Sequence, residues 1–153
     1  MKSMSITFLL ILISSSAMAF ADVDGIKIGA AWDPPTFKKN YAAKGIDLSC
    51  DQMHCTSEVP TSRGNISILI QALDGRVLEL SYLFPADLYD TILKGLNLGP
   101  PTRTSQGKKT DEYGVTVTDL ITEWREDGQV ATLEQYENST TGMFSLKAPA
   151  KPY

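Results

Sequence analysis

The feature that most constrains the fold of this chain is a pair of alternating apolar runs joined by a tight-turn dipeptide. Apolar residues occupy every second position in 66–70, and apolar residues return between positions 77 and 83. A period of two is typical of a strand with one buried face, and Asp74-Gly75 between the runs favours a two-residue hairpin turn. The sequence therefore predicts an antiparallel hairpin near the middle of the chain.

The N-terminal segment has the parts of a secretory signal peptide. Lys2 gives a positive start, residues 6–13 are apolar but too short to span a bilayer, and alanines stand at positions 17, 19 and 21. This spacing predicts cleavage after Ala21, with Ala19 as the other candidate and a retained anchor as the alternative. We expect a periplasmic or secreted protein with no membrane span in the mature chain.

The chain has two cysteines, Cys50 and Cys55. An oxidising compartment favours a disulfide between them, while free thiols and a metal site with His54 are the alternatives. The metal site is disfavoured because such closely spaced donors do not easily surround a tetrahedral ion and the chain has a single histidine. So small a ring would stabilise the fold by about 2 kcal/mol.

The other elements are predicted from periodicity and from residues that end helices. Helices are expected at 34–44, after Asp33, and at 85–98, before Gly99. Further strands are expected at 23–28, in a hairpin over 46–59 with the disulfide at its tip, at 115–124, at 130–136, and at 142–146 as a last edge strand. Residues 102–113 are basic and poor in apolar side chains, which predicts a loop.

This order predicts an α+β fold with two helices packed on one face of an antiparallel sheet. Residues 22–147 would form a single domain, and residues 148–153 a flexible tail. Each predicted helix is followed by strands with an Asp-Gly turn, at 74–75 and at 127–128. Two tandem helix-plus-hairpin halves and the ordinary alternation of an α+β protein both explain that order.

Periodicity also predicts which side chains form the core. One face of the central hairpin should meet one line of residues on the second helix, because a strand shows alternate residues to one face and a helix every third or fourth. These residues are Ile66, Ile68, Ile70, Leu88, Ile92 and Leu96.

Three short motifs carry a resemblance to known exported domains. They are Ile-Lys-Ile-Gly at 26–29, Leu-Asn-Leu-Gly-Pro-Pro at 96–101 and Glu-Trp-Arg-Glu-Asp-Gly at 123–128. On these motifs, residues 23–136 resemble small domains of the β-lactamase-inhibitor-like and outer-membrane-assembly-lipoprotein (SmpA/OmlA) type. The chain departs from that type in lacking the lipid-bearing cysteine and in starting its first helix with Trp-Asp-Pro-Pro. The resemblance implies an exported binding role and no particular partner.

Several function classes are disfavoured. A net charge of −4 argues against binding to nucleic acid, because phosphates need a basic surface. His54 is the single histidine, and no serine lies in a Gly-x-Ser-x-Gly motif. The paired carboxylates fall at helix starts, in loops or on strand rims, where solvated surface is the simpler interpretation. We therefore expect no enzyme, no cofactor and no metal.

Aromatic and basic side chains are the better candidates for function, because such residues anchor protein interfaces. Core packing is the alternative for the tryptophans, and a solvated loop is the alternative for the basic residues. The leading hypothesis is a non-catalytic exported module that binds another envelope protein, as an inhibitor, immunity factor or envelope-assembly accessory. The second is a carrier of a small apolar or lipid ligand. The candidate interface residues are Trp32, Arg103, Lys108, Lys109, Tyr113, Trp124 and Arg125.

Overall fold

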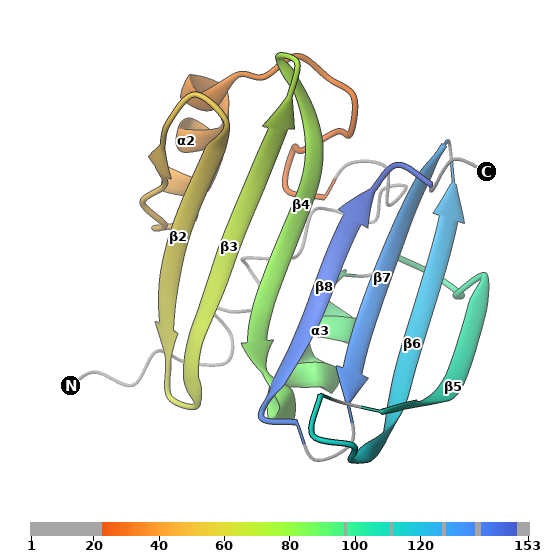
Figure 1. The fold of residues 1–153 in the computed structure, drawn as a ribbon. Coiled ribbons are helices and arrows are strands. Elements are labelled where there is room, and N and C mark those ends of the chain that lie inside the picture. Colours follow the sequence, from red (N-terminus) through yellow and green to blue (C-terminus); the bar gives the residue numbers. More distant parts are fainter. Residues whose placement is uncertain (1–22, 97, 111, 127, 137–138, 150–153) are drawn as a thin grey trace.

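Strands are the main secondary structure in the computed structural model, which describes residues 23–96, 98–110, 112–126, 128–136 and 139–149 (Figure 1). The predicted signal peptide, residues 1–21, lies outside the described residues, as does most of the predicted tail. The elements are α2 (Pro34–Ala42), β1 (Ser49–Cys50), β2 (His54–Thr61), β3 (Gly64–Leu73), β4 (Arg76–Pro85), a 3-10 turn η1 (Ala86–Leu88), α3 (Tyr89–Leu96), β5 (Arg103–Thr110), β6 (Thr116–Glu126), β7 (Gln129–Tyr136) and β8 (Thr141–Lys147).

The eight strands form one antiparallel sheet in the order β1-β2-β3-β4-β8-β7-β6-β5. The first four strands follow α2 and the last four follow α3. The two sets meet where β4 pairs with β8 (Figure 1). The prediction of an α+β fold with two helices packed on a sheet is therefore wrong, because the described part of the chain is mainly sheet with two short helices.

The sequence prediction underestimated strand content mainly at residues 102–113. This segment was expected to be a loop, but its residues 103–110 form β5 and pair with β6 along their whole length. The strand lacks apolar alternation because it is the last of the sheet and has solvent along its outer edge. The backbone pairing of such an edge strand does not require buried side chains.

The segment at 142–146 was expected to be an edge strand and is instead central. It lies in β8, between β4 and β7, and the side chains of Phe144 and Leu146 are fully buried. Gly142 is required there because a Cβ atom on it would lie 2.5 Å from the ring of Phe84 on β4. The three apolar residues of this segment predict a strand, but local sequence does not show its place in the sheet.

Residues 23–28 do not form the predicted strand. The N–H of Ile26 donates to the carbonyl of Val23 at 2.9 Å, which closes a turn in which Asp24 and Gly25 have positive φ values of 55° and 75°. Asp-Gly is a turn pair here as it is at 74–75. The two helices are also shorter than predicted. The first, α2, ends at Ala42, and the second, α3, begins at Tyr89.

The central hairpin is confirmed. β3 and β4 pair from Ser67↔Leu83 to Leu73↔Arg76, and Asp74 and Gly75 have φ values of 51° and 72°, as a two-residue turn of this hand requires.

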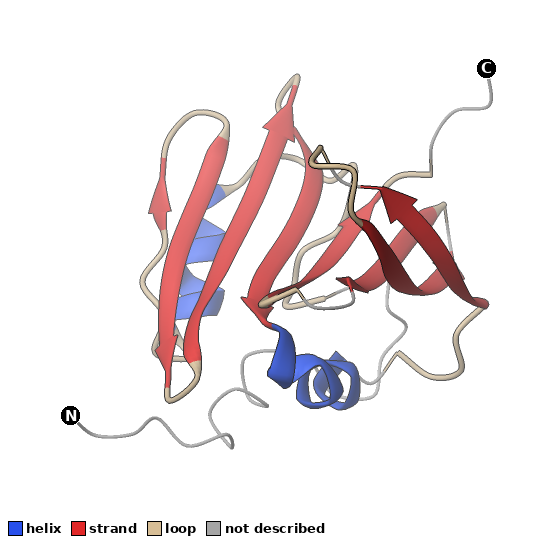
Figure 2. Cartoon of the chain, turned by 60° about the horizontal axis from the view of Figure 1, so that its bottom comes forward, coloured by secondary structure: helices blue, strands red, loops and turns tan. Residues whose placement is uncertain are grey.

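The core lies on the face of the sheet that carries both helices (Figure 2). The predicted core residues Ile66, Ile68, Ile70, Leu88, Ile92 and Leu96 are all buried in one cluster. The first helix, α2, also meets the central hairpin, because the hydroxyl of Tyr41 lies 2.9 Å from that of Tyr82 on β4. The second helix contacts the other half of the sheet, since the Tyr89 hydroxyl lies 3.1 Å from that of Thr122 on β6.

The predicted disulfide is confirmed. Cys50 and Cys55 are bonded at the turn between β1 and β2, where the two residues are also cross-strand partners. In the described part of the chain, no helix has the length and apolar character needed to cross a membrane.

Candidate functional site

The β5–β6 end of the sheet gathers most of the predicted interface residues. Arg103, Lys108 and Lys109 lie on β5, Tyr113 lies in the turn after it, and Trp124 and Arg125 lie on β6. Among them Tyr113 is the most exposed aromatic side chain, at 83%. The side chain of Lys109 lies outside the described residues. Pairing of β5 with β6 therefore brings together residues that the sequence analysis assigned to a basic loop and to a separate strand.

β5 is an open edge. It is the last strand in the sheet order, and Figure 1 shows no element beyond it among the described residues. Side chains from Arg103 to Lys108 are exposed, except for the half-buried Ser105. Backbone N–H and C=O groups on the outer side of such a strand are unpaired and can bind another extended chain.

Arg103 and Lys108 on this edge differ from Arg125 in their contacts. The guanidinium of Arg125 donates to the carboxylate of Glu123 at 2.6 Å, and this hydrogen bond raises the arginine pKa. Within the described part of the chain, neither Arg103 nor Lys108 forms an ion pair. The positive charge available to a partner at this edge therefore comes from β5.

Trp124 does not lie on the surface. It is 3% exposed, and its indole N–H donates to the carbonyl of Gly99 at 3.0 Å. The alternation of β6 explains this position, since Thr122 and Trp124 face the helix side while Glu123 and Arg125 face away. The structure therefore shows core packing for Trp124, which the sequence analysis gave as the alternative to an interface role.

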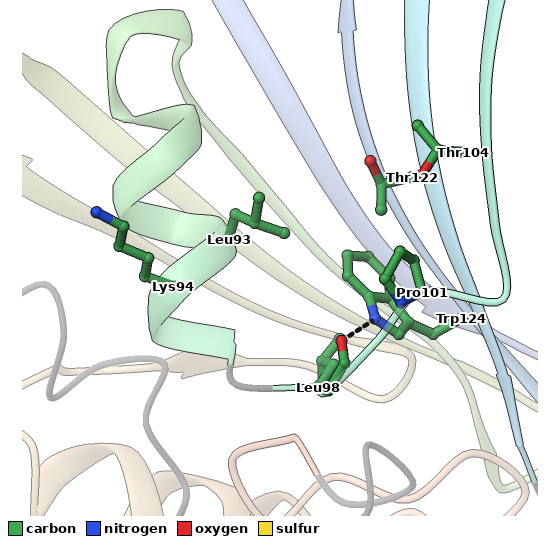
Figure 3. Close-up of a pocket in the computed structure, with 8 residues that line it drawn as sticks. Leu93, Lys94, Leu98, Pro101, Thr104, Thr122 and Trp124 are labelled. Atoms are coloured by element: carbon green, nitrogen blue, oxygen red, sulfur yellow. Dashed lines mark hydrogen bonds between the residues drawn. The ribbon is translucent and has the colours of Figure 1, made fainter.

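A cleft of about 540 Å³ separates α3 from the β5–β6 hairpin. Figure 3 shows Leu93 of α3 pointing across it toward the strands, while the ammonium of Lys94 points away. The cleft is lined by Leu93, Lys94, Leu98, Gly99, Pro101, Thr104, Thr122 and Trp124. Its lining is mostly apolar, with threonine hydroxyls on the strand side, which suits an apolar side chain or a small apolar ligand.

Trp32 lies apart from this hairpin. It precedes α2, is half-buried, and packs edge-to-face on Phe37 with ring centroids 5.3 Å apart. The indole N–H is buried without a hydrogen-bond partner among the described residues. The structure therefore does not bring Trp32 together with the other predicted interface residues.

Sequence reasoning missed a buried polar cluster under α2. Asp24 is 5% exposed and accepts hydrogen bonds from the ammonium of Lys44 and the hydroxyl of Tyr82, which in turn lies against that of Tyr41. Desolvation raises the pKa of Asp24, and the Lys44 ammonium opposes this shift. Burial and the nearby carboxylate raise the pKa of both tyrosines. No sequence spacing links these residues, which only the folded chain brings together.

The described residues contain no group of three or more side chains placed to hold a metal ion. Comparison with protein-family models, curated proteins and solved structures finds no match to this chain. The resemblance to β-lactamase-inhibitor-like and SmpA/OmlA-type domains stays a prediction.

Proposed function

We propose that this protein is a non-catalytic, exported module that binds another envelope protein through the β5–β6 end of its sheet. The observation that carries the proposal is the open edge of β5, which is exposed along most of its length. An exposed edge strand is a ready template for pairing with another chain. Arg103 and Lys108, which form no ion pair with the described residues, and the cleft behind β5 add charge and apolar contact at the same place.

Export to the periplasm or outside the cell is part of the proposal. It is supported by the signal-peptide pattern of residues 1–21 and by the disulfide between Cys50 and Cys55. Disulfides persist in oxidising compartments and are rare in the cytosol. Inhibition, immunity and envelope assembly are the roles that such a module would serve.

The test is affinity capture from an envelope extract with the mature protein as bait. The informative variant is R103E/K108E, which reverses the charge of β5. Its matched control is K38E/K39E, which reverses two exposed lysines on α2. We expect a protein that the parent and the control retain and the β5 variant loses. Retention by all three baits, or by none, would contradict the proposed surface.

A second candidate function is a carrier of a small apolar or lipid ligand. The cleft favours it, because about 540 Å³ lies within the range of small-molecule sites. Mass spectrometry of an organic extract of the purified protein distinguishes the two functions. A carrier would release a bound ligand that the L93W variant, with a larger side chain in the cleft, does not carry. A protein-binding module would release none from either protein.

A further inference from the structure

We infer that the partner presents an extended acidic segment, which pairs with β5 as a ninth strand and places one apolar side chain in the cleft behind it. This inference rests on the proposed function and deepens it by naming the chemistry of the partner. The contacts that carry it are the free backbone of β5, the charge on that strand and the position of Thr104.

The backbone of β5 supplies affinity without regard to sequence. Every residue from Arg103 to Thr110 pairs with β6 on one side, and no described strand pairs with β5 on the other. Strand addition at a sheet edge uses main-chain hydrogen bonds for affinity and alternate side chains for specificity. The partner segment must therefore be extended, and its backbone N–H groups must not already be hydrogen-bonded within the partner.

The charge of this edge selects an acidic partner. Arg103 and Lys108 are exposed at opposite ends of β5, on a protein whose net charge is −4. Arg103 lies beside Glu123 on the face without helices, while Lys108 lies beside Thr118 on the other face. A segment with carboxylates near both of its ends would therefore meet a cation at each end of the strand.

The same charges disfavour a second copy of this chain as the occupant. Antiparallel pairing of two β5 strands about Gln106 would set Arg103 of one copy at the register position opposite Lys109 of the other. Like charges that face each other across a pair of strands are destabilising. The basic edge thus discourages self-association while it leaves the strand free for an acidic chain.

The cleft adds a preference for one apolar side chain. Thr104 of β5 lines the cleft and pairs with Thr122 of β6, which lines it too. In a ninth strand, the residue opposite Thr104 projects from the same face of the sheet, because cross-strand partners share a face. That side chain would lie at the mouth of the cleft, with Leu93 and Trp124 further inside.

The direct test uses a fluorescein-labelled, acetylated peptide with glutamates at both ends and a central Thr-Val-Leu-Val-Thr. Three control peptides replace the glutamates by lysine, the central leucine by serine, or both valines by proline. Fluorescence anisotropy at low and high salt gives the affinities. Hydrogen exchange gives the location of binding. The mature protein, R103E/K108E and K38E/K39E are compared.

We expect the acidic peptide to bind at least about tenfold more tightly than the lysine and proline peptides, with salt weakening it. Replacing leucine by serine should weaken binding as well. The amides of β5 should gain protection, and R103E/K108E should lose about tenfold in affinity while K38E/K39E keeps it. Equal binding of acidic and basic peptides, or protection elsewhere than β5, would overturn the inference.

The capture experiment separates this inference from the function on which it rests. If the peptides do not bind β5 while the parent still captures a protein that R103E/K108E loses, the edge is the binding surface but the recognition mode is wrong. If neither a peptide nor a protein depends on the β5 charges, both proposals fail.

Discussion

The two ends of the sheet follow the same plan but finish differently. Beyond β2, the chain adds the short strand β1, ties it with the Cys50–Cys55 disulfide, and holds the approach to it by a hydrogen bond of 2.8 Å from the Ser57 hydroxyl to the Asp47 carbonyl. Beyond β5 there is no further described element. Both terminal strands leave backbone groups unpaired on their outer side, so the two ends differ in the length of that strand and in the disulfide that ties β1.

The helix side of the sheet shows the same contrast. Under α2, Tyr41, Tyr82 and Asp24 fill the space with buried rings and a polar cluster. Between α3 and the β5–β6 hairpin a cleft of about 540 Å³ remains. One half of the molecule thus ends in a short strand tied by a disulfide, and the other ends in a longer edge strand with a cleft beside it, which is why we place the function there.

The largest expected effect tests whether the two halves of the sheet share one core. Ile68 on β3 and Ile92 on α3 lie in one buried cluster, so Ile68→Ala and Ile92→Ala should each lower the free energy of unfolding by about 2–5 kcal/mol. Urea melts measure this, and each variant should unfold in one transition. Leu73→Ala, at a side chain that is 53% exposed, is the control. Two separate transitions would mean that the halves fold independently.

Removing the disulfide at the β1 edge has the next largest expected effect. Cys50→Ser with Cys55→Ser removes the disulfide and should cost about 2 kcal/mol through the unfolded state, while leaving the fold in place. Urea melts give the free energy, and hydrogen exchange should become faster in β1 and the facing part of β2. An unchanged urea midpoint would show that the bond does not stabilise this edge.

The polar cluster under α2 predicts a pH dependence. Burial raises the pKa of Asp24 above its ordinary 3.8, so above that pH the unfolded chain releases a proton that the folded state still holds. The Asp24 contribution to the free energy of unfolding should therefore fall as pH rises from 3.8 through the folded-state pKa. Urea melts of the parent and Asp24→Asn across this range measure it. A parent-minus-variant difference that stays constant or grows with pH would contradict the predicted direction.

The smallest expected effect is at the open edge itself. Arg103→Ala and Lys108→Ala should change the free energy of unfolding by less than about 0.5 kcal/mol, because both side chains are exposed and form no ion pair within the described part of the chain. The same urea melts provide the measurement. A larger loss of unfolding free energy in either variant would show that these cations stabilise the fold and are not available to a partner.

Local patterns predicted the central hairpin, the disulfide and six of the buried side chains. Ile66, Ile68 and Ile70 have a period that only a strand with one covered face explains, and Asp74-Gly75 favours the turn that joins β3 to β4. The candidate site was predicted only as separate residues. Arg103 and Trp124 are distant in sequence, and pairing of β5 with β6 brings their strands together.

The sequence by itself determined the features that depend on neighbours along the chain: turns, the small disulfide ring and the alternation of buried residues. Tertiary structure decided the rest. It made 142–146 the centre of the sheet and 103–110 its edge, because strand order is set by pairing across the whole chain and not by local composition. It also turned Trp124 inward and Arg103 outward, since a side chain's face follows from the register of its strand and from which face the helices cover.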